Sequence, residues 1–144
     1  SLSPVLLTLN CSENILRALP TLPPALSTLC CDNNQLSWLP AVLPTVLRLL
    51  CCNNNRLASL PTLPHALEML YCNNNVLKEL PTLPPALRIL YSHNNQLVKL
   101  PAFPTTLNTL HCHGNKLMRF PTPTQTLVNL VAKWAWSVHR FFYF

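Results

Sequence analysis

The sequence predicts an all-β repeat solenoid with one short parallel strand in each coil and an extended, proline-rich side opposite the strands. A unit of about twenty residues recurs along the chain, with leucine at four fixed positions. A single unit cannot bury its own leucines, but stacked units bury them in a continuous column. The chain of 144 residues also contains fifteen prolines and only one glycine, which excludes folds that depend on glycine turns.

The repeat reads L-x-x-L-x-C-x-x-N-x-L-x-x-L-P-x-L-P-x-x, and its positions are numbered 1 to 20 below. The second unit has one extra residue near Ala41 to Pro44. The repeats predict a solenoid domain over residues 1–126, with about six coils of 20–21 residues, followed by a degenerate last repeat over 127–144. The opening leucines are Leu6, Leu26, Leu47, Leu67, Leu87, Leu107 and Leu127.

Each coil is expected to place its strand at positions 3 to 5, paired in parallel with the next coil at a spacing of about 4.8 Å. Proline fixes φ and lacks an N–H donor, so the LPxLP linker is expected to be extended and free of helix.

Two columns of the repeat are interpreted as structural. Position 6 is expected to be a small buried side chain where a leucine would crowd its neighbours. Position 9 is expected to point inward and to bond backbone groups that the turn leaves unpaired. The position 6 cysteines are Cys11, Cys31, Cys52, Cys72 and Cys112, with Ser92 in the fifth unit. The position 9 asparagines are Asn14, Asn34, Asn55, Asn75, Asn95 and Asn115.

The pattern L-x-x-L-x-[LC]-x-x-N-x-L, joined by linkers such as Leu60 to Pro64 and Leu80 to Pro84, resembles the short bacterial leucine-rich repeats of the IpaH/YopM effector type. The resemblance covers residues 6 to about 126. It implies a leucine-rich-repeat fold, protein recognition through the concave face, and a bacterial protein that acts on a host partner.

Some members of this family carry a separate ubiquitin-ligase domain whose nucleophile lies in a C-x-D motif. The residues Cys30, Cys31 and Asp32 spell that motif, but they lie in a repeat strand, so a catalytic role is rejected. The resemblance leaves open that the chain is the substrate-recognition part of such an effector. The sequence itself assembles no catalytic set from its four acidic residues, and the protein is not expected to be an enzyme.

Positions 2, 3, 5, 7 and 8 are expected to face outward on the concave side, where repeat proteins usually bind. The middle coils carry apolar and aromatic side chains there, which favour a protein partner. The alternative is that these neighbours only stabilise adjacent parallel strands. The candidate partner-binding residues are Leu49, Met69, Tyr71, Ile89, Tyr91, His93, His111 and His113.

Two smaller clusters have alternative interpretations. The imidazoles of His93, His111 and His113 could hold Zn²⁺ or Cu²⁺, but no acidic ligand joins them. A polar binding rim is therefore favoured, and no metal or cofactor is predicted. Cys30 and Cys51 occupy one column on adjacent coils, within range of a disulfide. Free thiols are favoured for this pair as well.

Composition indicates which classes of partner and which cellular compartments are expected. Ten basic and four acidic residues give a net charge of +6 without a basic run of five or more, so no nucleic-acid partner is expected. The sequence shows neither a signal peptide nor a spanning stretch of 18 apolar residues. Seven cysteines in regular columns favour a reducing compartment, either the cytoplasm or the host cytosol of an effector-like protein.

The segment 127–144 has apolar residues at helical spacing, which predicts a short amphipathic helix that caps the last coil. A membrane-surface helix is less favoured. A third interpretation is that this end docks on another copy. End-to-end stacking of uncapped coils into a filament is thus an alternative function.

Overall fold

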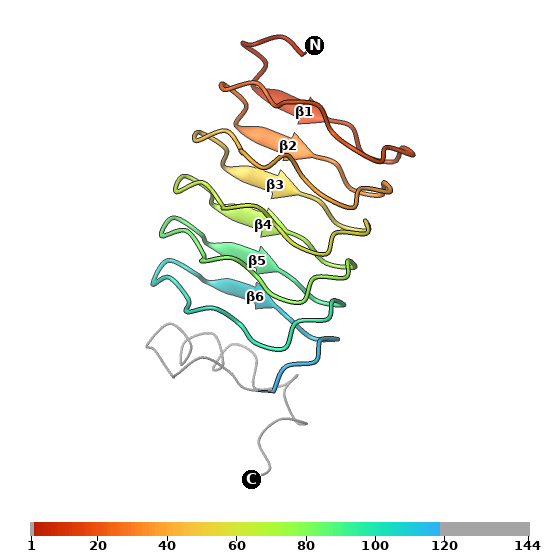
Figure 1. The fold of residues 1–144 in the computed structure, drawn as a ribbon. Coiled ribbons are helices and arrows are strands. Elements are labelled where there is room, and N and C mark those ends of the chain that lie inside the picture. The colour runs from red at the N-terminus through yellow and green to blue at the C-terminus, as the bar shows by residue number, and fades with distance from the viewer. Residues whose placement is uncertain (1, 119–144) are drawn as a thin grey trace.

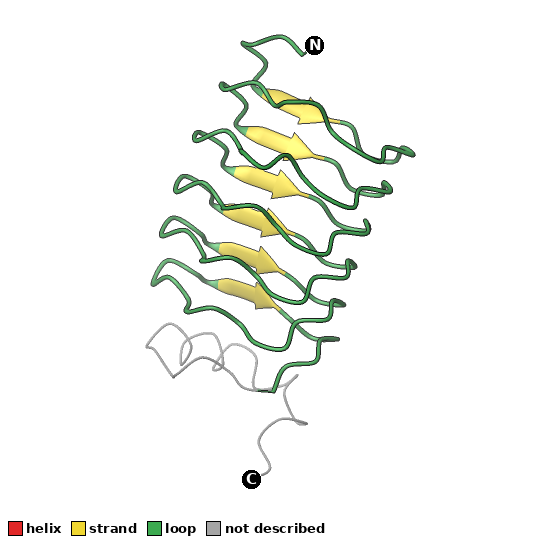
Figure 2. Cartoon of the chain, viewed as in Figure 1, coloured by secondary structure: helices red, strands yellow, loops and turns green. Residues whose placement is uncertain are grey.

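The computed structural model describes residues 2–118 and forms a single stack of coils (Figure 1). Six parallel strands lie side by side in sequence order, so each coil pairs with the coils before and after it. The described residues contain strands and loops but no helix (Figure 2). The strands are β1 (Thr8–Asn10), β2 (Thr28–Cys30), β3 (Leu49–Cys51), β4 (Met69–Tyr71), β5 (Ile89–Tyr91) and β6 (Thr109–His111). The predicted repeat solenoid, with a strand at positions 3 to 5, is therefore confirmed.

The strand register keeps equal repeat positions opposite each other. Met69 pairs with Ile89, and Tyr71 pairs with Tyr91. The extra residue of the second unit does not disturb this register, because Thr28 still pairs with Leu49. The insertion is accommodated in the linker, where Val42 and Val46 are exposed.

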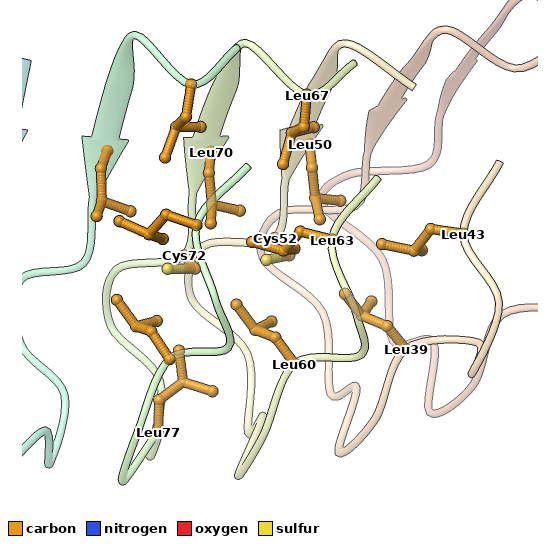
Figure 3. Close-up of a cluster of buried hydrophobic side chains, with 14 of the residues drawn as sticks. Leu39, Leu43, Leu50, Cys52, Leu60, Leu63, Leu67, Leu70, Cys72 and Leu77 are labelled. Carbon is orange, nitrogen blue, oxygen red and sulfur yellow. The ribbon is translucent and has the colours of Figure 1, made fainter. Parts of the chain in front are cut away.

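The core is a column of leucines enclosed by the coils. The middle residue of each strand points inward because side chains alternate along a strand, and Leu50 and Leu70 are fully buried. Linker leucines such as Leu60 and Leu63 close the column from the opposite side, with Cys52 between them (Figure 3). Core contacts run from coil to coil, so each coil is stabilised by its neighbours.

The linker ends in a tight turn that leads into the next strand. The N–H of Leu67 donates to the carbonyl of Pro64 at 3.0 Å, and Leu87 makes the same bond to Pro84 at 3.1 Å. Proline lacks an N–H but keeps its carbonyl acceptor. This geometry explains why position 18 can be proline in every described linker.

A second turn follows each strand and requires a left-handed residue at position 8. The φ angle lies between 52° and 58° in five coils and is 65° at Gly114 in the sixth. Asparagine and glycine adopt this conformation more readily than other residues. Position 8 was expected only to face outward, whereas the structure shows that its backbone forms the turn. The five non-glycine residues are Glu13, Asn33, Asn54, Asn74 and Asn94.

The expected cap helix and degenerate repeat of 127–144 lie outside the described residues. None of the described residues forms a helix with the length and apolar character needed to cross a membrane.

Candidate functional site

A buried ladder of asparagines supports the turn beside the sheet. Asn75 Nδ2 donates to the carbonyl of Cys52 in the preceding coil at 3.0 Å and to that of Cys72 in its own coil at 3.2 Å. Its Oδ1 accepts the N–H of Leu57 at 3.0 Å. Asn34, Asn55, Asn95 and Asn115 make equivalent bonds. At position 9, an amide side chain thus joins each coil to the one before it.

Asn14 lies at the first coil and differs from the other position 9 asparagines. Its side chain is exposed, and Nδ2 donates only to the Cys11 and Ser12 carbonyls of its own coil. Its structural role is therefore smaller than that of Asn75.

Positions 7 and 8 form two further ladders that the sequence interpretation assigned to the outer face. At position 7, the N–H of Asn73 donates to Asn53 Oδ1 at 3.0 Å, and the N–H of Asn53 donates to Asp32 Oδ1 at 2.6 Å. At position 8, Asn74 Nδ2 donates to Asn54 Oδ1 at 2.7 Å. The recurring N-N-N triplet was the signal for these ladders. Its three asparagines have three different roles.

The cysteines at position 6 lie in the core. Cys31, Cys52 and Cys72 are fully buried, and Cys31 Sγ donates to the carbonyl of Cys51 in the next coil at 3.2 Å. Burial raises the pKa of Cys72 to about 12 and that of Cys112 to about 11. These thiols stay protonated near neutral pH, so they are poor nucleophiles and metal ligands.

The outer face of the sheet is formed by positions 3 and 5 of each strand. Met69, Tyr71, Ile89 and Tyr91 lie on it, but each is half-buried rather than exposed as expected. Neighbouring strands are only about 4.8 Å apart, so side chains in one column cover each other's flanks. Leu49 occupies the same face and is also half-buried.

Five rings form a continuous cluster at the C-terminal half of this face. Tyr71 and Tyr91 meet edge to face with ring centroids 5.1 Å apart, and Tyr91 lies 4.1 Å from His111. His93 and His113 stack with centroids 4.6 Å apart and planes inclined by 18°. His93 also lies 6.1 Å from Tyr91, which joins the position 5 and position 7 columns. We call Tyr71, Tyr91, His93, His111 and His113 the ring cluster.

Two imidazoles of the ring cluster, those of His93 and His111, are shifted toward the neutral form. Burial lowers the pKa of His93, and the nearby His113 and His111 lower it further. Burial and His113 lower the pKa of His111 in the same way. The Nδ1 atom of His93 is buried and has no hydrogen-bond partner among the described residues.

The same histidines were weak candidates for metal binding in the sequence. Over residues 2–118, no group of three or more His, Cys, Asp or Glu side chains is arranged to hold a metal ion. The ring contacts of His93, His111 and His113 are with one another and with Tyr91.

One ion pair borders the face. Arg48 Nη1 lies 2.6 Å from Glu68 Oε1, with side-chain exposures of 66% and 31%. An exposed pair contributes little to stability. In this pair, the positive charge of Arg48 balances the negative charge of Glu68, the acidic side chain at position 2 beside Met69.

Some exposed apolar side chains lie outside the strands. Trp38, Val98 and Met118 occupy the turn side of their coils, with exposures of 56%, 44% and 84%. The N–H of Met118 donates to the carbonyl of Val98, so these two residues are neighbours. The sequence interpretation missed this group because positions 12 and 13 vary from unit to unit.

The stacked parallel strands, the leucine columns and the asparagine ladder define a leucine-rich-repeat fold, and solved structures agree. No protein-family model matches this sequence, and the search of curated proteins gives no match. The leucine-rich-repeat domain of a Shigella effector superimposes with a TM-score of 0.76 at 37% identity, over 80% of this chain and 52% of the effector chain.

Two further structures are similar. YopM, a leucine-rich effector protein from Yersinia pestis, gives a TM-score of 0.69 at 36% identity, over 89% of this chain and 42% of that chain. A leucine-rich-repeat protein from Leptospira interrogans gives 0.67 at 27% identity, over 87% and 36% of the two chains. This chain thus spans about half of the Shigella chain and less of the other two.

Proposed function

We propose that this chain is a non-catalytic scaffold that binds a protein partner on the outer face of its sheet, as a bacterial effector-like recognition module. The observation that carries the proposal is the ring cluster. Aromatic side chains contribute large contact areas and are enriched where binding energy concentrates. Met69 and Ile89 lie beside these rings and supply an apolar margin.

The side chains on the outer face of the sheet are held in place, which favours binding. Ring contacts and flanking neighbours hold the side chains before a partner arrives, so less conformational entropy is lost on association. The polar ladders beneath the adjoining turns fix the backbone that presents them. The neighbouring structures support the same class of function, because two of them are leucine-rich-repeat regions of effector proteins.

A non-catalytic role is supported by the side chains on this face. Tyrosine, histidine and aliphatic groups dominate it, and burial raises the pKa of Tyr71 above its usual range. A general acid or base needs a pKa near the working pH and a positioned partner. The histidines meet other rings instead, and Glu68 is engaged by Arg48.

The test is affinity capture with three versions of the tagged chain: wild type, Tyr71→Ala with Tyr91→Ala, and Trp38→Ala as the control. Trp38 is exposed on another side of the stack, so its loss also removes an accessible aromatic ring. A partner that binds wild type and Trp38→Ala directly, and loses at least about tenfold in affinity to the double variant, supports the proposal. Circular dichroism checks that all three chains remain folded.

The opposite pattern would refute the proposal. Binding that survives the double variant and disappears in Trp38→Ala would place recognition on the turn side. Self-assembly is the alternative, because the first coil exposes the apolar side chains of Val5, Leu7 and Ile15. Light scattering on the same samples tests this alternative. A mass that rises steeply with concentration and falls on Val5→Asp would favour end-to-end stacking instead.

A further inference from the structure

Two thiols lie next to each other on the outer face of the sheet. Cys30 ends β2 and Cys51 ends β3, and the two residues are paired in register. Both are half-buried, unlike the fully buried cysteines of the core. From this placement we infer that Cys30 and Cys51 are a redox modification site that closes into a reversible intramolecular disulfide. This inference does not depend on the proposed binding function.

The backbone geometry suits this bond. Paired residues of neighbouring parallel strands lie about 4.8 Å apart at Cα, which is within the range that a disulfide spans. The two side chains are also neighbours. Burial raises the pKa of Cys51, and the charge of Cys30 and a hydrogen bond with its thiol raise this pKa further.

The other cysteines are poorer partners. Cys31 and Cys52 follow these two residues directly, but alternation along the strand turns their side chains into the core. Each donates its thiol to a backbone carbonyl of the next coil. Burial raises the pKa of both thiols, as it does for Cys51, so the inward orientation and the bonds to carbonyls are what make Cys31 and Cys52 poorer partners.

The reaction needs a peroxide as oxidant. The Cys30 thiol releases a proton, its thiolate attacks one peroxide oxygen, and the O–O bond breaks. The departing hydroxide takes up the released proton, so a sulfenic acid and one water result. The sulfur of Cys51 then attacks the sulfenic sulfur, loses its proton and displaces a second water. Two thiols and one hydrogen peroxide thus give one disulfide and two waters. A dithiol reductant returns both thiols by exchange.

The bond would connect coils two and three on the column that continues into the ring cluster. Asn10 lies on one side of the pair and Tyr71 on the other, each in register with a cysteine. A cross-link there fixes the two coils that flank the longest linker, which contains the inserted residue. Oxidation is therefore expected to raise the thermal midpoint of the folded chain, because the cross-linked unfolded chain has fewer conformations.

The test is peroxide treatment of the folded chain, alkylation of the remaining thiols after unfolding in urea, and tryptic mass mapping without reductant. Cleavage after Arg48 separates Cys30 from Cys51, so the disulfide appears as a linked pair of peptides, 18–48 and 49–56. The expected result is a linked pair that carries two alkyl groups, on Cys31 and Cys52, and that a dithiol reductant separates.

Four single serine variants decide which thiols react. Cys30→Ser and Cys51→Ser should lose the linked pair, whereas Cys31→Ser and Cys52→Ser should keep it. Ser92 shows that the core column accepts serine, so the two controls are expected to fold. A linked pair that persists in Cys30→Ser or Cys51→Ser would overturn the inference. So would oxidation of wild type that yields only cross-links between molecules or sulfinic acid at Cys30.

Discussion

At the scale of single residues, the polar side chains of this protein have a different structural role at each repeat position. Asparagine at position 9 bonds carbonyls of two coils at once, so it stabilises the turn and the stack together. Asparagine at position 7 accepts the backbone N–H of the next coil. Histidine replaces asparagine at position 7 in coils five and six, where the rings stack.

Replacing Asn75 by alanine should destabilise the fold strongly. Its side chain is buried, and its loss leaves one N–H and up to three carbonyls without that partner. The expected cost is about 3 kcal/mol in the free energy of unfolding by urea. Asn14→Ala is the matched control, because that exposed residue bonds only its own coil, and it should cost less than about 1 kcal/mol. Equal losses for the two variants would contradict the ladder's role between coils.

Stability should fall as the solution becomes acidic through the histidine range. The pKa of His93 and of His111 is lowered from 6.5 in the folded chain. The unfolded chain therefore binds protons first, and this contribution to stability is complete above about pH 6.5 and lost as the pH falls toward the folded pKa values. We expect a lower urea midpoint at about pH 5.5 than at about pH 7.5.

The matched variant for this effect is His93→Asn with His113→Asn. It places asparagine at position 7 of coils five and six, as Asn53 and Asn73 do in coils three and four. The double variant should show a smaller loss between the same two pH values. An unchanged pH dependence would place its origin outside the histidine stack.

At the scale of elements, the coil is a three-residue strand between two turns of different chemistry. The turn before the strand uses a proline carbonyl as acceptor. The turn after it needs a left-handed residue, which asparagine supplies in four coils and glycine in one. Glu13 takes this conformation in the first coil with φ of 58°, although glutamate has no special preference for it.

Glu13→Asn is therefore expected to stabilise the protein. Asparagine tolerates the left-handed region better, and its side chain can extend the position 8 ladder toward Asn33. The free energy of unfolding should rise by about 1 kcal/mol in a urea titration. Glu13→Gln removes the same charge without relieving the backbone, so it should give little change. A gain of equal size in both variants would assign the effect to charge instead.

At the scale of the whole molecule, stability is expected to vary along the stack. The leucines of coils two to five are buried, whereas Leu6, Leu9 and Leu16 of the first coil are only half-buried. A coil with a neighbour on one side has fewer contacts to lose when it opens. The ring cluster lies in coils four to six, and two of these, coils four and five, belong to the strongly buried part of the stack.

Amide hydrogen exchange measures this gradient with equivalent bonds. The N–H of Cys11 and that of Cys52 each donate to a strand carbonyl of the next coil at 2.8 Å. Cys52 should nevertheless exchange at least about tenfold more slowly, because its opening disrupts packing on both sides. Equal protection at low protein concentration would contradict the gradient. Protection of Cys11 that appears only at high concentration would indicate that a second copy covers the first coil.

The sequence alone determined the features that repeat with a local period. Leucine spacing predicted the coils, the strand positions and the absence of helix from the linkers, and the structure confirms them over residues 2–118. The insertion in the second unit was also visible before the structure. These features depend on the residues that every unit shares, so the pattern of one repeat is enough to predict them.

Only the tertiary structure decided how side chains twenty residues apart meet. Stacking distributed the N-N-N triplet among three ladders, made Met69 and Tyr91 half-buried, and brought His93 onto His113. Such outcomes depend on orientation and on the particular residue in the next coil. The pairing of Cys30 with Cys51 already followed from the repeat column, and the register confirms it. A pattern of repeat positions specifies which columns exist, but packing between coils fixes what each column does.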